Sequence, residues 1–375
     1  MGIYVIATDG NPNAVGLRYA DKAVVADITS EDEMLNVARI ERIDGVIHPC
    51  SEVAMNVMGR INDELHLHGI SRETAVRATN KHLMREAFKI YDAPSPKSYC
   101  SAEVENGYKL FVSMADRSIL KPSRNSGSRG IAEINPGLDF EDFSRLFDFA
   151  KDESRDKSVM IEQFVDGPEF SVEIIVWNSE VHVLQVTDKK TTGAPNFVEL
   201  GHSQPSMYSE DVVAAVKDAA IRGVKALRLN DCAAHAEIKV QDGEPYIMEI
   251  GARLGGDFIS TELTHLSTGI DMVAAAINVA LGDEPILIPK SKPQGVAIRY
   301  FTPSPGVVKS IENINLLQAA NVYDAEIYVK PGDLVREVKS SLDRSGHVIV
   351  TAPSAKEAID AAETVIKNVK IITEA

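Results

Sequence analysis

The apolar positions in the first quarter of the chain form short runs that alternate with amphipathic stretches. Short apolar runs indicate strands, and apolar residues three or four positions apart indicate helices. Strands are expected at 3–8, 23–26 and 45–48, and helices at 30–42, 52–65, 72–79 and 81–91. This alternation predicts an α/β unit with a parallel sheet, and the breaker Ala93-Pro94-Ser95-Pro96 predicts its end.

The middle of the chain is richer in strands. They are expected at 118–122, 131–134, 159–165, 170–177, 181–186, 233–240 and 245–250. Helical spacing after Ser209, taken as an N-cap, predicts a long helix, and a second helix is expected at 270–281. From about Gly295, short strands, Pro-Gly turns and a helix at 355–367 predict a small α+β domain. We therefore expect three domains, at 1–95, 96–290 and 291–375.

Composition narrows the classes of function. The 375 residues include 39 Lys and Arg against 55 Asp and Glu, and the net charge of −16 disfavours nucleic acid as a partner. No apolar run approaches the roughly 20 residues that span a bilayer, and no signal peptide is visible, so we expect a cytoplasmic protein without a membrane partner. Cys50, Cys100 and Cys232 are widely spaced, which indicates neither a disulfide framework nor a zinc site.

Glu237 and Glu249 flank the turn Gln241-Asp242-Gly243, and this pair allows a geometric test. If the turn is a three-residue loop, Glu237 faces Ile247, His235 faces Glu249, and both carboxylates share one face, roughly 5–8 Å apart. A two-residue loop would put them on opposite faces. On one face they could bind one or two cations, with Mg²⁺ as the natural candidate. The alternative is an edge hairpin with both side chains solvated.

Arg253 favours ligand binding over that alternative. It lies four residues past Glu249, just beyond the strand, and is followed by Gly255-Gly256, where the backbone can approach a ligand closely. An arginine in this place can neutralise the oxygens of a phosphoryl group during transfer.

Two further segments have the chemistry to hold a nucleotide. Small residues follow Lys121 in the loop 123–130, and their amides could wrap a phosphate, although a loop that binds nothing explains the same pattern. The segment 162–165 with Glu169 could supply an apolar slot and a ribose acceptor, although an ordinary strand end explains it equally well. H-E-x-x-H, G-x-S-x-G and G-x-G-x-x-G motifs are absent from the sequence, and His202 is an isolated loop histidine.

Taken in order, these residues resemble the ATP-grasp superfamily, an α/β and α+β multidomain fold. The segments 197–205 and 248–256 are similar to the L-amino-acid ligase branch, whose enzymes join amino acids into dipeptides, and the similarity covers nearly the whole chain. The resemblance implies an N-terminal α/β domain, an ATP-grasp domain with a lid at about 115–165, and a C-terminal α+β domain. It also implies ATP and Mg²⁺ as cofactors, with Mn²⁺ as a substitute, and leans towards a homodimer.

The resemblance also implies a role for each site residue. Those expected to bind ATP are Lys81, Lys121, Ser126, Gly127, Ser128, Glu162, Gln163, Phe164, Val165 and Glu169. Glu237 and Glu249 would bind the metal, and Arg253 would be catalytic. His202, Gly255 and Gly256 would line the amino-acid pocket.

Two departures from the family pattern stand out. Gly251 occupies a place where many ATP-grasp enzymes carry Asn, which removes one expected cation ligand. Family members also begin with a strand, a loop and a helix before the segment equivalent to 2–9, so the N-terminal sheet is expected to lack its first strand.

The expected function is an ATP-dependent ligase that joins a carboxylate, expected to be that of an amino acid, to an amine through an acyl phosphate. A second hypothesis is another ATP-grasp activity, of the purine type or one that activates formate or bicarbonate. A third is a nucleotide-binding regulator without catalysis. Fold-level resemblance alone does not choose among them.

Overall fold

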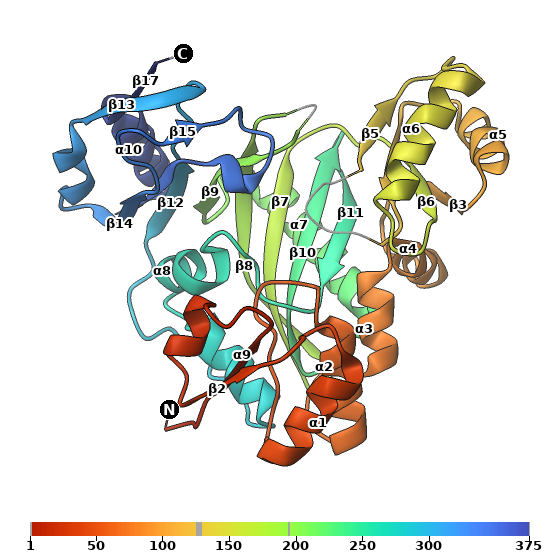
Figure 1. Ribbon diagram of the computed structural model, residues 1–375, viewed down its shortest axis with the longest axis horizontal. Coiled ribbons are helices and arrows are strands. Elements are labelled where there is room, and N and C mark those ends of the chain that lie inside the picture. The colour runs from red at the N-terminus through yellow and green to blue at the C-terminus, as the bar shows by residue number, and fades with distance from the viewer. Residues whose placement is uncertain (1, 125–129, 194–195, 375) are drawn as a thin grey trace.

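An eight-stranded antiparallel sheet forms the centre of the computed structural model, which describes residues 2–124, 130–193 and 196–374 (Figure 1). The strands lie in the order β11-β10-β7-β8-β9-β12-β16-β14. They are β7 (Glu169–Trp177), β8 (Glu180–Thr191), β9 (Glu199–Gln204), β10 (Cys232–Gln241), β11 (Glu244–Gly251), β12 (Gly295–Tyr300), β14 (Val322–Ile327) and β16 (Gly346–Ala352). The last three strands in the spatial order come from beyond residue 290, so the sheet crosses the domain boundary expected there.

Helices cover both faces of this sheet because β7 is apolar on both. The helices of this part are α7 (Glu210–Leu227), η2 (Ile259–Leu263), α8 (Thr264–Thr268) and α9 (Met272–Ala280). Val172 and Ile174 share a core with α7, whereas Ile175 packs with α9. The side chain of Ser209 accepts a hydrogen bond from the Val212 amide, which confirms the expected cap of α7. Burial on both faces makes β7 and its neighbours a rigid base for a site.

The N-terminal segment packs below the sheet in Figure 1. It contains β1 (Ile6–Asp9), η1 (Val15–Arg18), β2 (Lys22–Val25), α1 (Glu31–Glu41), α2 (Met55–Leu65), α3 (Arg72–Thr79) and α4 (Lys81–Ile90). The strands β1 and β2 pair in parallel, as expected. The strand expected at 45–48 is wrong. A Cβ on Gly45 would lie 2.4 Å from the Ala280 carbonyl oxygen, and the Pro49 carbonyl accepts from the Leu254 amide, so this stretch runs against loops and a helix end.

A small second sheet, in the order β3-β6-β4-β5, lies to the right of the central sheet in Figure 1. Its elements are β3 (Ser98–Ser101), α5 (Val104–Met114), β4 (Ser118–Pro122), β5 (Ala132–Ile134), α6 (Phe140–Asp152) and β6 (Val159–Gln163). Phe111, Phe143 and Phe147 from the two helices form its core with Ile161 of β6. This unit has its own hydrophobic core and carries Lys121 and Glu162 on adjacent strands.

The C-terminal part packs against the far end of the central sheet. Its remaining elements are β13 (Gly306–Glu312), η3 (Ile314–Gln318), β15 (Leu334–Val335), η4 (Ser341–Asp343), α10 (Ala355–Asn368) and β17 (Lys370–Glu374), with β15, β13 and β17 forming a three-stranded sheet. Ala358 and Ala362 of α10 pack on Ala297 and Val348, which confirms the final amphipathic helix. Within the described residues, no helix is long and apolar enough to cross a membrane.

Candidate active site

The hairpin of β10 and β11 places Glu237 directly opposite Glu249, in a register that differs from the expected one. The turn is the two-residue Asp242-Gly243 with positive φ angles of 54° and 85°, as in a type I′ hairpin, so the expected three-residue loop is wrong. Such a turn alone would put Met248 opposite Glu237. A β-bulge between Glu237 and Ile238 adds one residue to β11 and makes Glu249 the partner instead.

Both carboxylates line a cavity of about 330 Å³. Most other predicted site residues line it too: Lys81, Lys121, Gln163, Phe164, Val165, Glu169 and Arg253. Glu162, His202, Gly255 and Gly256 are not among the lining residues. Ser126, Gly127 and Ser128 lie outside the described residues. The cavity thus gathers residues from the N-terminal segment, the small sheet and the central sheet.

The lysines expected to contact phosphates are each held by a carboxylate. Lys81 Nζ lies 2.8 Å from Glu249 Oε1, and Lys121 Nζ lies 2.6 Å from Glu162 Oε2. Glu162 is fully buried and also accepts from Arg85 at 2.9 Å. Burial alone would raise the pKa of Glu162, but the charges of Arg85 and Lys121 outweigh it and lower the pKa to about 2. Glu162 therefore holds Lys121 through an ion pair without itself lining the cavity.

The segment from Gln163 to Val165 lines one edge of the cavity, and one of its backbone amides is available to a ligand. The amides of Gln163 and Phe164 donate to the carbonyls of Lys97 and Arg117, each at 2.9 Å. Within the described residues, the Val165 amide donates to no protein acceptor. The Arg117 guanidinium stacks on the Phe164 ring, 3.8 Å from its centre. A flat base could thus meet an aromatic face and a donor here.

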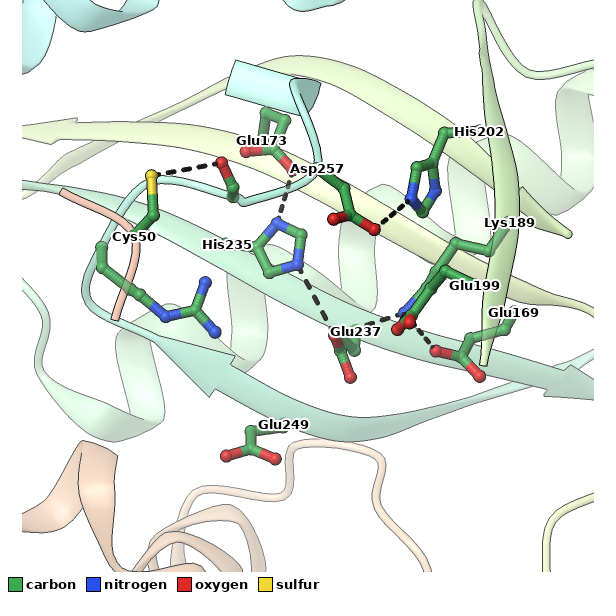
Figure 2. Close-up of polar contacts among 12 residues, drawn as sticks. Cys50, Glu169, Glu173, Lys189, Glu199, His202, His235, Glu237, Glu249 and Asp257 are labelled. Atoms are coloured by element: carbon green, nitrogen blue, oxygen red, sulfur yellow. Dashed lines mark hydrogen bonds and ion pairs between the residues drawn. The ribbon is translucent and has the colours of Figure 1, made fainter. Parts of the chain in front are cut away.

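Lys189 of β8 lies among three cavity carboxylates, and the sequence analysis missed it (Figure 2). Its Nζ lies 2.5 Å from Glu169, 3.3 Å from Glu237 and 3.8 Å from Glu199. Burial would lower the pKa of Lys189, but the three carboxylates outweigh this effect and raise it. The lysine is therefore charged and balances the acidic residues around it.

One ion pair and a series of buried hydrogen bonds connect Glu237 to the backbone of Gly255. His235 Nδ1 lies 2.6 Å from Glu173, and His235 Nε2 lies 3.7 Å from Glu237. The Ser260 hydroxyl donates to Glu173 at 2.8 Å and accepts from the Gly255 amide at 2.7 Å. Burial would lower the pKa of His235, but the Glu173 carboxylate raises it to about 9. Glu173 therefore links Glu237, through His235, to the glycine loop.

Arg253 lies beside Glu52, which comes from the N-terminal segment. Arg253 Nη2 is 3.5 Å from Glu52 Oε1, and Arg253 Nε is buried with no hydrogen-bond partner among the described residues. Burial, followed by repulsion from Glu249, raises the pKa of Glu52 to about 7. A Cβ added to Gly251 would lie 3.2 Å from Arg253 Nε and 3.3 Å from Glu52 Oε1. Arg253 and Glu52 thus border the space that a side chain at position 251 would enter.

His202 meets the C-terminal part of the chain at Asp257. His202 Nε2 lies 3.3 Å from Asp257 Oδ2, and Arg344 pairs with both oxygens of Asp257 at 2.7 and 2.8 Å. The Arg344 guanidinium also stacks on the Tyr300 ring at 3.7 Å. Burial would raise the pKa of Asp257, but the hydrogen bonds from Arg344 and His202 lower it. Asp257 follows Gly255-Gly256, so this network ties the glycine loop to the C-terminal part.

The donor set fits a Mg²⁺ ion that arrives with phosphates. Glu237 and Glu249 offer carboxylate oxygens from opposed positions, while the described residues contain no group of three or more His, Cys, Asp or Glu side chains that could hold a metal. Mg²⁺ is commonly held by one or two carboxylates, with phosphate and water oxygens completing its shell. The unpartnered Nε of buried Arg253 is a donor suited to one of those phosphate oxygens.

Comparison with known proteins identifies the class. Residues 115–262 match the family model of the ATP-grasp domain, and residues 299–374 match that of the L-amino acid ligase C-terminal domain 2. The part of the chain at 115–262 is therefore an ATP-grasp domain, and the part at 299–374 is of the type found at the C-terminus of L-amino acid ligases. The sequence-based recognition of this family and its multidomain α/β fold is confirmed.

Individual relatives support the same placement. The L-amino acid ligase of Bacillus licheniformis superposes with a TM-score of 0.83 at 20% identity, over 100% of this chain and 93% of that one. Phosphoribosylglycinamide synthetase of Anaerococcus prevotii gives 0.79 at 23% identity, over 100% and 94%. Alanine–anticapsin ligase of Bacillus subtilis is 26% identical over 66% of this chain. The chain spans 56% of that protein's length and 62% of that of another curated relative, from Sinorhizobium fredii.

Sequence reasoning missed several polar residues of the site, among them Glu52, Glu173, Lys189, His235 and Arg344. Three of them left a signal, because Glu173, Lys189 and His235 interrupt apolar strands with charged or polar side chains. A buried polar residue in a strand interior needs a partner, and that need points to a site or a network. Glu52 and Arg344 left no such signal, since they lie outside the strands that carry the site.

Proposed function

We propose that this protein is an ATP-dependent ligase that joins the carboxylate of an amino acid to an amine through an acyl phosphate, releasing ADP and phosphate. The observation that carries the proposal is the direct pairing of Glu237 with Glu249 in a cavity that Lys81, Lys121 and Arg253 also line. This set offers carboxylates for a metal and cations for phosphate oxygens in one place. The matches to the ATP-grasp domain and the L-amino acid ligase C-terminal domain point to the same chemistry.

The cavity has two ends that suit the two ends of ATP. The base would lie against Phe164 with the Val165 amide as a donor, and Glu169 would accept from the ribose hydroxyls. The triphosphate would run towards Lys81 and Lys121, which then exchange their carboxylate partners for phosphate oxygens. Bound Mg²⁺ would spread the charge of these oxygens, with Glu237 and Glu249 holding it in place.

Positioning supplies most of the catalysis in phosphoryl transfer. An oxygen of the substrate carboxylate attacks the γ-phosphorus, the bond to the β-phosphate oxygen breaks, and ADP leaves. A neutral amine then attacks the carbonyl carbon of the acyl phosphate, phosphate departs with the bonding electrons, and the amine loses a proton. Arg253, which lies beside Glu52, would neutralise the transferring phosphoryl group.

The amino-acid end of the proposal rests on the region beyond Arg253. Gly255 is held by Ser260, and His202 and Arg344 meet at Asp257 just after the glycine pair. These groups come from β9, the loop after β11 and the C-terminal part, the same part that matches the L-amino acid ligase domain. Hydrogen-bonding side chains such as these can select a polar substrate. A substrate analogue that lacks the matching polar group would leave these side chains unpaired.

The test is ATP- and Mg²⁺-dependent phosphate release across a panel of paired amino acids, with mass detection of the product. A pair that stimulates release and yields a dipeptide supports the proposal. Glu249→Ala and Arg253→Ala should then lose activity by about 100-fold or more. Lys190→Met serves as the control, since Lys190 pairs with Glu363 of α10 and does not line the cavity.

A second candidate is an ATP-grasp ligase for a sugar amine, because phosphoribosylglycinamide synthetase also superposes over the whole chain. The same panel extended to ribosyl amines, formate and bicarbonate separates the two. Release stimulated by one of these and by no amino acid pair would replace the amino-acid assignment. Nucleotide binding without any stimulated release would point to a regulator.

A further inference from the structure

Among the described residues, the ammonium of Lys189 pairs only with carboxylates of the cavity. Its side chain is 4% exposed, and its ammonium lies 2.5 Å from Glu169 and 3.3 Å from Glu237 among the described residues (Figure 2). Glu169 is the proposed ribose acceptor and Glu237 a proposed metal ligand. Lys189 therefore pairs with a carboxylate of the proposed ribose site and with a carboxylate of the proposed metal site.

Glu249, the second proposed metal ligand, is also paired with a lysine. Glu249 lies 2.8 Å from Lys81 Nζ, and Lys81 begins α4 in the N-terminal segment. Glu237 and Glu249 are cross-strand partners, so two ionised carboxylates at this spacing would repel each other without a cation between or beside them. The two lysines supply that positive charge.

The neighbouring lysine shows that this placement is specific. Side chains alternate across a strand, and Lys190 points to the other face of β8, where its 49% exposed side chain pairs with Glu363. Lys189 and Lys190 share sequence context and charge but only Lys189 reaches the cavity. They form a matched pair for experiment.

We propose that Lys189 is a built-in counter-cation that keeps Glu169 and Glu237 from free divalent metal and releases them only to a metal–nucleotide complex. The inference rests on the proposed nucleotide site. A free metal ion must displace the ammonium from Glu237 and leave it buried without an acceptor, which is unfavourable. A nucleotide triphosphate brings phosphate oxygens that accept from the displaced ammonium, so the obstacle disappears.

A thermodynamic consequence follows from this exchange. If nucleotide strengthens metal binding by a given factor, metal strengthens nucleotide binding by the same factor. The protein should therefore bind metal and nucleotide together and hold free metal poorly. Lys189 is in this sense a positioning residue, because it acts through the carboxylates that it holds.

The experiment titrates Mn²⁺ into the full chain and follows bound metal by electron paramagnetic resonance, with and without a non-hydrolysable ATP analogue. Wild type should bind free Mn²⁺ about 100-fold more weakly than Mn²⁺ with the analogue. Lys189→Met should bind free Mn²⁺ about 10-fold more tightly than wild type and show smaller coupling. Lys190→Met should match wild type, and Lys189→Arg should still exclude free metal.

The wild-type titrations decide the matter even if Lys189→Met does not fold. Equal Mn²⁺ affinity with and without the analogue would overturn the inference, as would a folded Lys189→Met that binds free Mn²⁺ no more tightly than wild type. Failure of the analogue to bind under any condition would instead overturn the proposed nucleotide site, and the inference with it. Binding of the analogue together with equal free-metal affinity overturns the inference alone.

Discussion

Glu237 and Glu249 face each other across β10 and β11 because a β-bulge adds one residue between the turn and Glu249. The two-residue turn at Asp242-Gly243 sets one register, and the bulge shifts it by one. Both carboxylates consequently reach the same cavity, which neither the turn nor the strand pattern would achieve alone.

This pairing predicts that each carboxylate is needed separately. Glu237→Gln and Glu249→Gln preserve shape but remove one anionic ligand, so each should lower the Mg²⁺-dependent rate by about 100-fold and raise the Mg²⁺ concentration for half-maximal activity. Steady-state phosphate release at varied Mg²⁺ measures both effects. Glu244→Gln is the control, because it changes an exposed glutamate on the same strand. Full activity in either site variant would contradict the assigned pairing.

Lowering the pH should reduce the free energy of unfolding through protonation of Glu162. The pKa of Glu162 is lowered from 4.5 to about 2, so between these values the unfolded state binds more protons than the folded state. The stability that this pair contributes is present above pH 4.5 and is lost as pH falls towards 2. Between pH 6 and pH 3 the loss from this group should be about 2 kcal/mol.

Urea unfolding at the two pH values tests this prediction. Glu162→Gln cannot titrate, so its unfolding free energy should fall by about 2 kcal/mol less than that of wild type over the same interval. The variant starts from lower stability, because Arg85 and Lys121 lose their buried partner. An identical pH dependence in both proteins would show that Glu162 does not carry this effect.

The Glu173–His235 pair should matter for stability and for the charge of His235. Glu173→Ala leaves a buried imidazolium without its partner and should lower the unfolding free energy by about 3–5 kcal/mol, with a smaller loss for Glu173→Gln. In Glu173→Gln, nuclear magnetic resonance titration should find the pKa of His235 well below its wild-type value of about 9. Glu180→Ala, at an exposed position of β8, is the control. An unchanged His235 pKa would refute the assigned contact.

The strand pattern predicted most of the central sheet because apolar alternation is a local property. It could not predict whether an apolar run finds a strand partner, and the run at 45–48 packs against the end of α9 and the loop after β11 instead. The shared face of Glu237 and Glu249 was predicted correctly for the wrong reason, since loop length and a bulge have compensating effects on register.

The polar network of the site was beyond local reasoning. Glu173 and His235 are adjacent only because β7 pairs with β10 in one particular register, and Lys189 of β8 reaches Glu237 of β10 across the strand β7. Glu52 and Arg344 enter from segments far away in sequence. Single residues of the right chemistry could be proposed from motif order, but their partners depend on long-range pairing that periodicity does not encode.

The contact between Asp257 and Arg344 should control the amino-acid end of the site and leave ATP alone. Asp257 accepts two hydrogen bonds from Arg344 and lies 3.3 Å from His202, yet it does not line the cavity that suits ATP. Asp257→Asn removes the charge that holds both partners. Loss of charge-assisted hydrogen bonds should raise the KM for the amino-acid substrate about 10-fold or more, with the KM for ATP nearly unchanged.

Initial rates at varied amino acid and varied ATP separate these two constants. Asp324→Asn is the control, since Asp324 also pairs with a histidine of the C-terminal part, His347, but is half exposed and lies on β14 at the sheet edge. If Asp257→Asn raised both KM values equally, Asp257 would support the whole cavity and not its amino-acid end. If neither constant moved, the substrate would lie elsewhere, and the tie between the glycine loop and the C-terminal part would be structural only.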